Sequence, residues 1–442
     1  MTRPNVLYIH SHDTGRYLQP YGHAIPTPNL QRLAEEGVLF RQAFCAAPTC
    51  SPSRAALLTG QTPHSCGMLG LVNRGFELRH PERHLAQTLR TAGYHTAVMG
   101  VQHVVRDATT TGYDTVAGVG GRAADVTPAA VAFLRQAPPQ PFFLDVGFFE
   151  THRVFHAPTE REDARYCLPP LPLPDAPETR ADMAAFKASA RVLDDAVGAV
   201  LAALADAGLA RQTLVISTTD HGPAFPGMKC NLTDHGCGVS LIIRGPRSFS
   251  GGRVVDAMVS HLDVFPTVCE VTGIDPPTWL QGNSLVPFIG DETGQVHEEL
   301  FAEVNYHAAY EPQRAIRTAR WKYIRRFVDY DRPLLANCDD GPTKDLWLRH
   351  GWSEHVLPAE QLYDLTFDPV ETCNRAAAPA LAATVADLRQ RLDSWMVVTD
   401  DPLRHGPVPR PAGTVVNRAE DPSPGTVPNA SSRPTPQTPG SS

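Results

Sequence analysis

The chain has 442 residues, of which 42% are hydrophobic, and a formal net charge of -8 at pH 7. This length allows one large core with a smaller appended unit, because single cores stop growing at about 250 to 300 residues. The acidic balance, without any run of Lys and Arg, argues against a nucleic-acid partner.

The N-terminal residues are typical of a first strand rather than of a targeting segment. Residues 1–10 lack the charged start, apolar stretch and cleavage site of a signal peptide. No window approaches the about 20 apolar residues that cross a bilayer. The nine cysteines are odd in number and scattered without CxxC pairs, which favours reduced thiols. We therefore expect a cytoplasmic protein with no membrane partner.

Short apolar runs rich in β-branched or aromatic residues alternate with helical patterns along the first half of the chain. Strands are expected at residues 6–9, 95–99, 142–146, 214–217 and 239–243. Helices are expected at residues 27–36, 55–58, 85–92, 128–136 and 183–207. This alternation predicts an α/β fold with a mostly parallel sheet that helices cover on both faces.

Ionisable residues follow four of the predicted strands at the points where the strands end. They lie in the segments 11–13, 100–103, 150–152 and 219–222. In open α/β sheets, ligands bind beyond the carboxyl ends of the strands. We therefore expect the functional site at this edge of the sheet.

A cysteine-centred motif lies between the first two of these segments. Pro52 and Arg54 follow Cys50 at the second and fourth positions, and a helix-forming run then ends at Gly60. The pattern places Cys50 at a helix N-terminus, where free N–H groups and the helix dipole favour an anion. Arg54, one turn later, points back toward the same end. An inert, buried thiol is the alternative interpretation of this local pattern.

The composition changes twice toward the C-terminus. Short strands near residues 317–325 and 361–371, and then a helix at 380–396, predict a small antiparallel sheet with a packed helix. From residue 404, Pro, Ser, Thr and Gly dominate, and few large apolar residues offset the ordering entropy. The chain is therefore expected to have a catalytic α/β domain, a smaller C-terminal α+β subdomain and a disordered tail, at residues 1–298, 299–403 and 404–442.

The segment Cys50-Ser-Pro-Ser-Arg54, with Leu-Leu-Thr-Gly after it, resembles the signature of the formylglycine-dependent sulfatases in the alkaline-phosphatase-like superfamily. The resemblance runs in motif order over residues 4–396. It implies the alkaline-phosphatase-like fold. It also implies that formylglycine-generating machinery oxidises Cys50 to Cα-formylglycine, whose hydrated aldehyde attacks sulfur.

The resemblance further implies a divalent metal ion beside this nucleophile. The ligands expected from the family pattern are His12, Asp13, Asp220, His221 and an oxygen of the modified Cys50. His12 stands where the family has an aspartate, and an alternative is that it hydrogen-bonds Asp13 without touching the metal. The family implies Ca²⁺, whereas two carboxylates with two imidazoles also suit Mn²⁺, Fe²⁺ or Zn²⁺.

A family motif, Gly-Lys-x-His, is only partly present in the chain. His103 matches its histidine, but Val101 replaces its lysine. A lost cation weakens the stabilisation of sulfate oxygens. Gln102, Arg106 and Lys229 are candidates to replace it.

Three further residues are candidates for contact with the substrate. His152 resembles the histidine that protonates the leaving group, and a loop histidine can serve as a general acid. Lys229 resembles the basic residue that binds the transferring group, and Asn73 is a candidate for binding the same oxygens or the substrate. An exposed histidine or lysine without a role is the alternative for each of the first two.

The resemblance predicts hydrolysis of a sulfate ester or a sulfamate (N-sulfate), on a small-molecule or saccharide substrate. Pro63-His64 and residues 67–71 are most similar to sulfamidase-like sulfatases, whereas Asp220-His221 also resembles the pair in phosphonate monoester hydrolases. A phosphonate monoester or phosphodiester hydrolase with the same site is therefore an alternative. The lost lysine and aspartate also leave open a catalytically silent binding protein with the sulfatase fold.

Overall fold

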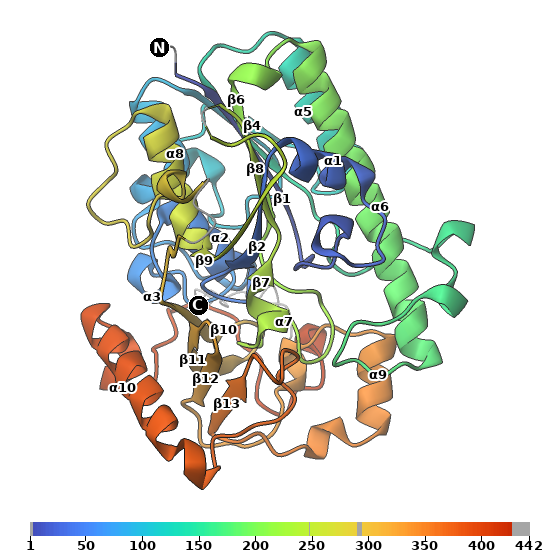
Figure 1. The fold of residues 1–442 in the computed structure, drawn as a ribbon, viewed down its shortest axis with the longest axis vertical. Helices are drawn as coiled ribbons and strands as arrows, with labels where there is room; N and C mark the ends of the chain where they lie inside the picture. Colours follow the sequence, from blue (N-terminus) through green and yellow to red (C-terminus); the bar gives the residue numbers. More distant parts are fainter. Residues whose placement is uncertain (1–2, 247, 290–293, 427–442) are drawn as a thin grey trace, which may run out of the picture.

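The computed structural model describes residues 3–246, 248–289 and 294–426, and it contains two sheets with helices around them (Figure 1). Over these residues, the larger sheet has nine strands in the order β4-β3-β5-β1-β6-β8-β2-β7, and β9 also pairs with β2. The strands are β1 (Asn5–Ser11), β2 (Val38–Phe44), β3 (His95–Gly100), β4 (Thr115–Ala117), β5 (Phe142–Gly147), β6 (Thr213–Thr219), β7 (Gly238–Val239), β8 (Leu241–Arg244) and β9 (Arg253–Ser260).

The centre of the larger sheet is parallel, and one side of it is mixed. β1 pairs in parallel with β5 and β6, and β3 pairs in parallel with β4 and β5. β8 is antiparallel to both β6 and β2. The predicted strand at 239–243 is broken at Ser240, because its first part pairs with the end of β2 and its second part with β6. The expected α/β class with a mostly parallel sheet is confirmed, although β2, β4 and β9 were not predicted.

Helices cover both faces of the larger sheet, with α1, α5 and α6 on one face and α2 and α8 on the other (Figure 1). Alternate residues of β1 enter the two cores: Val6 and Tyr8 enter one, and Leu7 and Ile9 enter the other. Within the described ranges, no helix is long and apolar enough to cross a membrane. The helices are α1 (Pro28–Glu36), α2 (Cys50–Thr59), α3 (Pro63–Cys66), α4 (Leu85–Thr91), α5 (Ala123–Arg135), α6 (Pro177–Asp206), α7 (Asp234–Cys237), α8 (Val264–Thr272), α9 (Pro342–Arg349) and α10 (Ala382–Val398).

The smaller sheet is antiparallel and lies between α10 and the larger sheet. Its four described strands, in order, are β10 (Glu299–Tyr306), β11 (Tyr310–Thr318), β12 (Trp321–Arg326) and β13 (Glu360–Asp364). Ile316 and Tyr323 pack against Leu388 and Leu392 of α10. Ala315 and Ile324 point the other way and join the core of the larger sheet. The two sheets therefore share one apolar core.

Residues 404–426 lie in the predicted disordered tail, yet they have a described path. The backbone N–H of Asn417 donates to Ala308 O at 2.8 Å, and Arg74 Nη1 donates to Asn417 Oδ1 at 2.9 Å. Arg74 Nη2 donates to Pro424 O at 2.8 Å. Over these residues the prediction of disorder is wrong, because hydrogen bonds to the folded protein replace the missing apolar burial. We call residues 417–426 the C-terminal strap; residues 427–442 of the predicted tail lie outside the described residues.

Candidate active site

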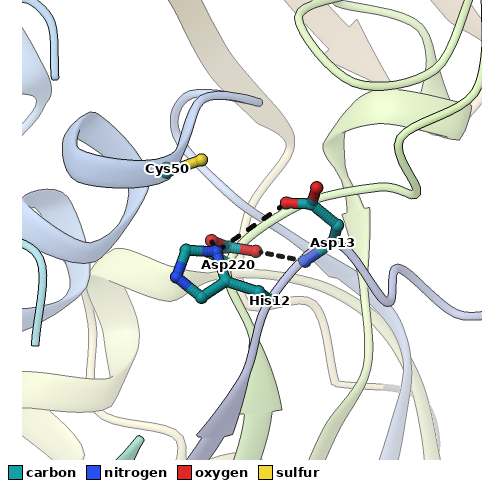
Figure 2. A group of neighbouring side chains, drawn as sticks. All are labelled: His12, Asp13, Cys50 and Asp220. Atoms are coloured by element: carbon teal, nitrogen blue, oxygen red, sulfur yellow. Dashed lines mark hydrogen bonds and ion pairs between the residues drawn. The ribbon is translucent and has the colours of Figure 1, made fainter. Parts of the chain in front are cut away.

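Two strand ends and one helix N-terminus converge at a buried group of side chains (Figure 2). His12 and Asp13 follow β1, Asp220 follows β6, and Cys50 begins α2. One possible ligand atom from each of the four lies within 4.8 Å of the others. Each of the four residues is at most 3% exposed. The structure therefore brings together three segments that lie far apart in the sequence, near residues 12, 50 and 220.

Asp220 organises the loop that carries Asp13. Its Oδ1 accepts hydrogen bonds from the backbone N–H of Asp13 at 2.8 Å and of His221 at 2.9 Å. Asp13 has a φ of 53°, in the left-handed region that non-glycine residues avoid, and such strain gathers at functional sites. Burial alone would raise the pKa of Asp220, but His221 and Arg54 hold this pKa well below its usual range. Asp220 is therefore a carboxylate.

The donor atoms of this group suit a divalent cation. His12 Nδ1 and Asp13 Oδ1 are buried without a hydrogen-bond partner in the described part of the chain, although His12 Nδ1 lies 2.9 Å from Asp220 Oδ2. His221 Nδ1–H donates to Gly222 O at 2.9 Å, which leaves Nε2 with a free lone pair. That Nε2 lies 3.4 Å from Cys50 Sγ and 3.4 Å from Asp13 Oδ1. A backbone-oriented imidazole of this kind is the usual arrangement of a metal-binding histidine.

Lys229 lies at the other side of Asp13. Its ammonium donates to Asp13 Oδ2 at 2.9 Å and to Asp339 Oδ2 at 2.9 Å, and it lies 3.4 Å from His152 Nε2. Burial alone would lower the pKa of Lys229, but Asp13 and Asp339 raise it well above its usual range. The site therefore keeps a permanent positive charge at this position.

Two histidines and one asparagine form the more exposed side of the site. The ring centroids of His152 and His103 lie 5.5 Å and 5.8 Å from that of His12. His103 Nε2 lies 3.3 Å from the exposed Asn73 Oδ1. Burial and, for His152, the nearby Lys229 lower the pKa of both imidazoles. All three predicted residues therefore lie near the metal-ligand candidates.

The environment of Cys50 disfavours chemistry by the unmodified thiol. The side chain is buried at the first position of α2, and this burial raises the pKa of the thiol far above its ordinary value. Lys229 opposes this shift without overcoming it. Since the thiolate is the nucleophilic form of cysteine, an unmodified Cys50 would be inert near neutral pH.

Of the candidates for the missing lysine at position 101, only Lys229 faces the site. The side chain of Gln102 folds onto its own loop, where its Oε1 accepts from the backbone N–H of Val104 at 2.7 Å. Arg106 forms an exposed ion pair with Glu77 at 3.3 Å. Gln102 and Arg106 are therefore excluded as replacements in this structure.

Two residues of the site were not predicted, because no sequence motif marks them. Asp339 lies in the segment between β12 and β13 of the smaller sheet, and its carboxylate accepts a hydrogen bond from Lys229. His307, in the loop after β10, is 5% exposed, and burial lowers its pKa to about 3. Both come from the region after residue 299, so only the packing of the two sheets places them here.

Comparisons with known proteins match this architecture. Residues 4–274 match the sulfatase family model, and residues 229–346 match the model of the N-sulphoglucosamine sulphohydrolase C-terminal region. The human N-sulphoglucosamine sulphohydrolase is 30% identical over 90% of this chain and 91% of its own length.

Solved structures show the same fold. A protein in complex with its substrate D-glucosamine-2-N,6-O-disulfate superposes with a TM-score of 0.70 and 19% identity, over 92% of this chain and 99% of that chain. The phosphonate monoester hydrolase of Agrobacterium radiobacter superposes with a TM-score of 0.67 and 22% identity, over 90% and 96%. With the family model covering more than half of its length, the chain belongs to the sulfatase family of hydrolases.

Proposed function

We propose that this enzyme hydrolyses a sulfate ester or a sulfamate with a formylglycine formed from Cys50. The observation that carries the proposal is the contact between the helix that begins with Cys50 and the buried metal-ligand candidates, where His221 Nε2 lies 3.4 Å from Cys50 Sγ. A hydrated aldehyde at this position has one hydroxyl to attack sulfur and a second through which the sulfate is released. An unmodified serine or thiol has no such second group.

The surrounding side chains have distinct parts in this proposal. Lys229 binds sulfate oxygens with its fixed positive charge, and Arg54 stabilises the deprotonated nucleophile from the same helix. His152 donates a proton to the leaving oxygen or nitrogen. His103 and Asn73, on the exposed side, contact the sulfate or the remainder of the substrate. Each of these roles agrees with the position of the residue around Asp13 and Cys50.

A divalent cation completes the proposed site. His12, Asp13, Asp220, His221 and the modified Cys50 would hold it, and it would polarise the sulfate oxygens. Family resemblance favours calcium, whereas the two imidazoles favour manganese, iron or zinc. Metal analysis of the protein purified from its native host distinguishes these cases, and loss of the metal in both the His12→Ala and Asp220→Ala variants is expected.

The substrate is expected to be a small-molecule or saccharide sulfate. The human relative is named for sulphoglucosamine, and the structural neighbour binds a glucosamine disulfate. Asp339 and His307 add hydrogen-bonding groups beside the site that suit a hydroxyl-rich leaving group. Release of inorganic sulfate from glucosamine N-sulfate and from glucosamine 6-O-sulfate tests this assignment.

Peptide mass spectrometry tests the nucleophile. The Cys50 peptide from the native host is expected to be about 18 Da lighter than the cysteine form. Cys50→Ala is expected to abolish sulfate release, and Cys50→Ser is expected to give at most a trapped covalent ester. Full activity of Cys50→Ala would refute the mechanism, and an unmodified Cys50 without turnover would favour a catalytically silent binding protein.

A phosphonate monoester or phosphodiester hydrolase with the same residues is the second candidate. It is favoured by the Asp220-His221 pair and by the shared fold of the phosphonate monoester hydrolase. The two transition states are similar in charge and geometry, so one site can serve both. The ratio of kcat/KM for 4-nitrophenyl sulfate to that for phenylphosphonate monoester decides between the two.

A further inference from the structure

A buried series of hydrogen-bonded side chains, Tyr113, Asp145 and His10, leads to Arg54. Tyr113 OH donates to Asp145 Oδ2 at 2.5 Å, and His10 Nε2 lies 2.8 Å from Asp145 Oδ1. His10 Nδ1 in turn contacts Arg54 Nη1. His10 is on β1 and Asp145 is on the neighbouring strand β5, so the sheet itself holds them together.

The proton positions in this series of hydrogen bonds follow from which groups can donate and which can accept. A carboxylate only accepts hydrogen bonds, so His10 Nε2 carries the proton that it donates to Asp145. A guanidinium only donates, so His10 Nδ1 must present its lone pair to Arg54. A neutral imidazole with its proton on Nε2 is therefore the form that satisfies both neighbours.

The protein provides a fitted space for this imidazole. His10 is 1% exposed and stacks on Tyr8, with ring centroids 4.7 Å apart. A Cβ atom at Gly147 would overlap Val101 O and lie 2.5 Å from His10 Cε1, so the backbone of Val101 and the imidazole ring both require glycine at this position of β5. Asp145 is completely buried. Removal of either side chain would leave the facing atom of the other, Asp145 Oδ1 or His10 Nε2, buried without this hydrogen bond.

Arg54, at the end of this hydrogen-bonded series, contacts the proposed catalytic residues. Arg54 Nη2 donates to Asp220 Oδ2 at 3.0 Å and to Ser11 O at 2.9 Å. Arg54 Nε has no partner among the described residues, so the contacts of the two terminal nitrogens fix the plane of the guanidinium. His10 provides one of these contacts.

We propose that His10 and Asp145 are positioning residues that orient Arg54 toward Asp220 and the nucleophile at position 50. Asp145 fixes the proton of His10 on Nε2, His10 then accepts from Arg54, and Arg54 holds Asp220. The proposal rests on the proposed function for its catalytic consequence, whereas the arrangement of His10 and Asp145 stands independently of it.

Paired variants test the proposal through kcat and KM for a sulfate ester, with thermal unfolding as the measure of folding. His10→Leu removes the acceptor, and His10→Asn keeps an acceptor oxygen close to the position of Nδ1. We expect His10→Leu to lower kcat by about 100-fold or more with little change in KM, as for removal of a donor that stabilises developing charge. His10→Asn is expected to stay within about tenfold of the wild type. Equal losses in the two variants, or a kcat of His10→Leu within about threefold of wild type, would overturn the proposal.

Asp145→Asn provides a second, nearly isosteric test. Its amide can donate to His10 Nε2, which moves the imidazole proton to Nδ1, where it faces Arg54. We expect a loss of kcat of about 100-fold or more, whereas Tyr113→Phe, which leaves the proton of His10 in place, is expected to stay within about threefold. A folded Asp145→Asn variant with wild-type kcat would overturn the proposal.

Nitrogen NMR of ¹⁵N-histidine-labelled protein tests the geometry without turnover. The signals of His10, assigned by their loss in His10→Asn, are expected to show a protonated Nε2 and a bare Nδ1. A protonated Nδ1 would overturn the inference even if the wild type hydrolyses sulfate esters. An inactive wild type with the expected signals would instead refute only the proposed function.

Discussion

At the scale of single residues, the site differs from the family pattern in its charges. His12 replaces a carboxylate, and Val101 replaces a lysine, so one negative and one positive group are missing. Lys229 is the buried cation that remains in contact with Asp13. The proposed cation would therefore have imidazole nitrogens in place of some of the carboxylate oxygens that the family resemblance implies.

If His152 is the general acid, the rate of hydrolysis is expected to be higher at acidic pH than at basic pH. Burial and Lys229 lower its pKa below the ordinary 6.5, and a general acid works only when protonated. The rate with an alkyl or saccharide sulfate should therefore fall as the pH rises through this lowered pKa. His152→Ala should remove that basic limb and slow such substrates by about 10²- to 10⁴-fold.

The leaving group provides the check on this role. 4-Nitrophenolate leaves without a proton, so His152→Ala should slow 4-nitrophenyl sulfate far less than an alkyl sulfate. His156→Gln, in the same loop, keeps a hydrogen-bond donor near Glu150 and serves as the control. If His152→Ala slowed both substrates equally, His152 would not be the general acid.

At the scale of elements, the N-terminus of a helix provides the proposed nucleophile and holds it near the other residues of the site. The motif around Cys50 was predicted to begin a helix, and α2 does begin at Cys50. Its end is set by Gly60, which has a φ of 65° and closes the helix with a hydrogen bond from its N–H to Ala56 O. Ser53 Oγ, within the first turn, donates to Asp220 O at 2.5 Å. This hydrogen bond therefore attaches the first turn of α2 to the loop that contains Asp220.

The start of α4 is expected to make the stability depend on pH. His84 Nδ1 caps this helix by accepting from the backbone N–H of Ala86 at 3.1 Å, and burial lowers the pKa of His84 from 6.5 to about 4. The unfolded state therefore binds a proton below about pH 6.5 that the folded state refuses until about pH 4. The contribution of His84 to the free energy of unfolding is therefore fully present above pH 6.5 and decreases as the pH falls toward 4.

His84→Asn tests this effect, because asparagine is a good N-cap that does not titrate in this range. Between pH 7.5 and pH 5, the wild type should lose about 2 kcal/mol more of its free energy of unfolding than the variant. Urea unfolding at the two pH values measures the difference. The exposed His405→Asn is the control and should retain the wild-type pH dependence. A pH dependence of His84→Asn equal to that of wild type would contradict the role of the cap.

At the scale of the whole molecule, segments from the second half of the chain complete the site. Asp339 lies between β12 and β13 of the smaller sheet and pairs with Lys229, which follows β6. The C-terminal strap ties the two regions together: Arg74 binds Asn417, and Ser423 Oγ donates to Asp340 Oδ2 at 2.5 Å. Arg74 and Asp340 are the immediate neighbours of Asn73 and Asp339. The strap therefore supports both sides of the proposed substrate site.

Asn417→Ala is expected to loosen this support. Asn417 is 5% exposed, and its side chain bonds Arg74, Asp421 and the backbone of Ser423. Loss of buried hydrogen bonds should lower the free energy of unfolding by about 1 to 3 kcal/mol and raise KM more than it lowers kcat. Urea unfolding and steady-state kinetics measure the two effects.

The control for the strap is Glu420→Ala, whose side chain is 66% exposed in a surface ion pair with Arg418. Such exposed pairs contribute about 0 to 1 kcal/mol, so this variant should behave as the wild type. Faster tryptic cleavage after Arg418 in Asn417→Ala than in Glu420→Ala would show that the strap has loosened. Equal stability and KM in the two variants would mean that the strap does not support the site.

The local sequence by itself determined the central strands β1, β3, β5 and β6, the helix that begins with Cys50 and the set of residues at the strand ends. Each depends on neighbours in the chain: apolar runs, helix-start chemistry and a motif of five residues. That information was sufficient to predict the family, the mostly parallel sheet and the candidate residues Cys50, Asp13 and Asp220. The structure brings these three residues together.

Only the tertiary structure decided which distant groups face one another. No local pattern relates Asp339 to Lys229, or His10 to Asp145 and Arg54, because these pairs form where strands and loops far apart in sequence pack together. The path of the strap was missed for the same reason: a Pro-rich segment with little apolar surface looks disordered alone, and it becomes ordered only through partners such as Arg74 and Ala308. Hydrogen bonds and charges act over a few ångströms in space, whereas sequence patterns report only on neighbours along the chain.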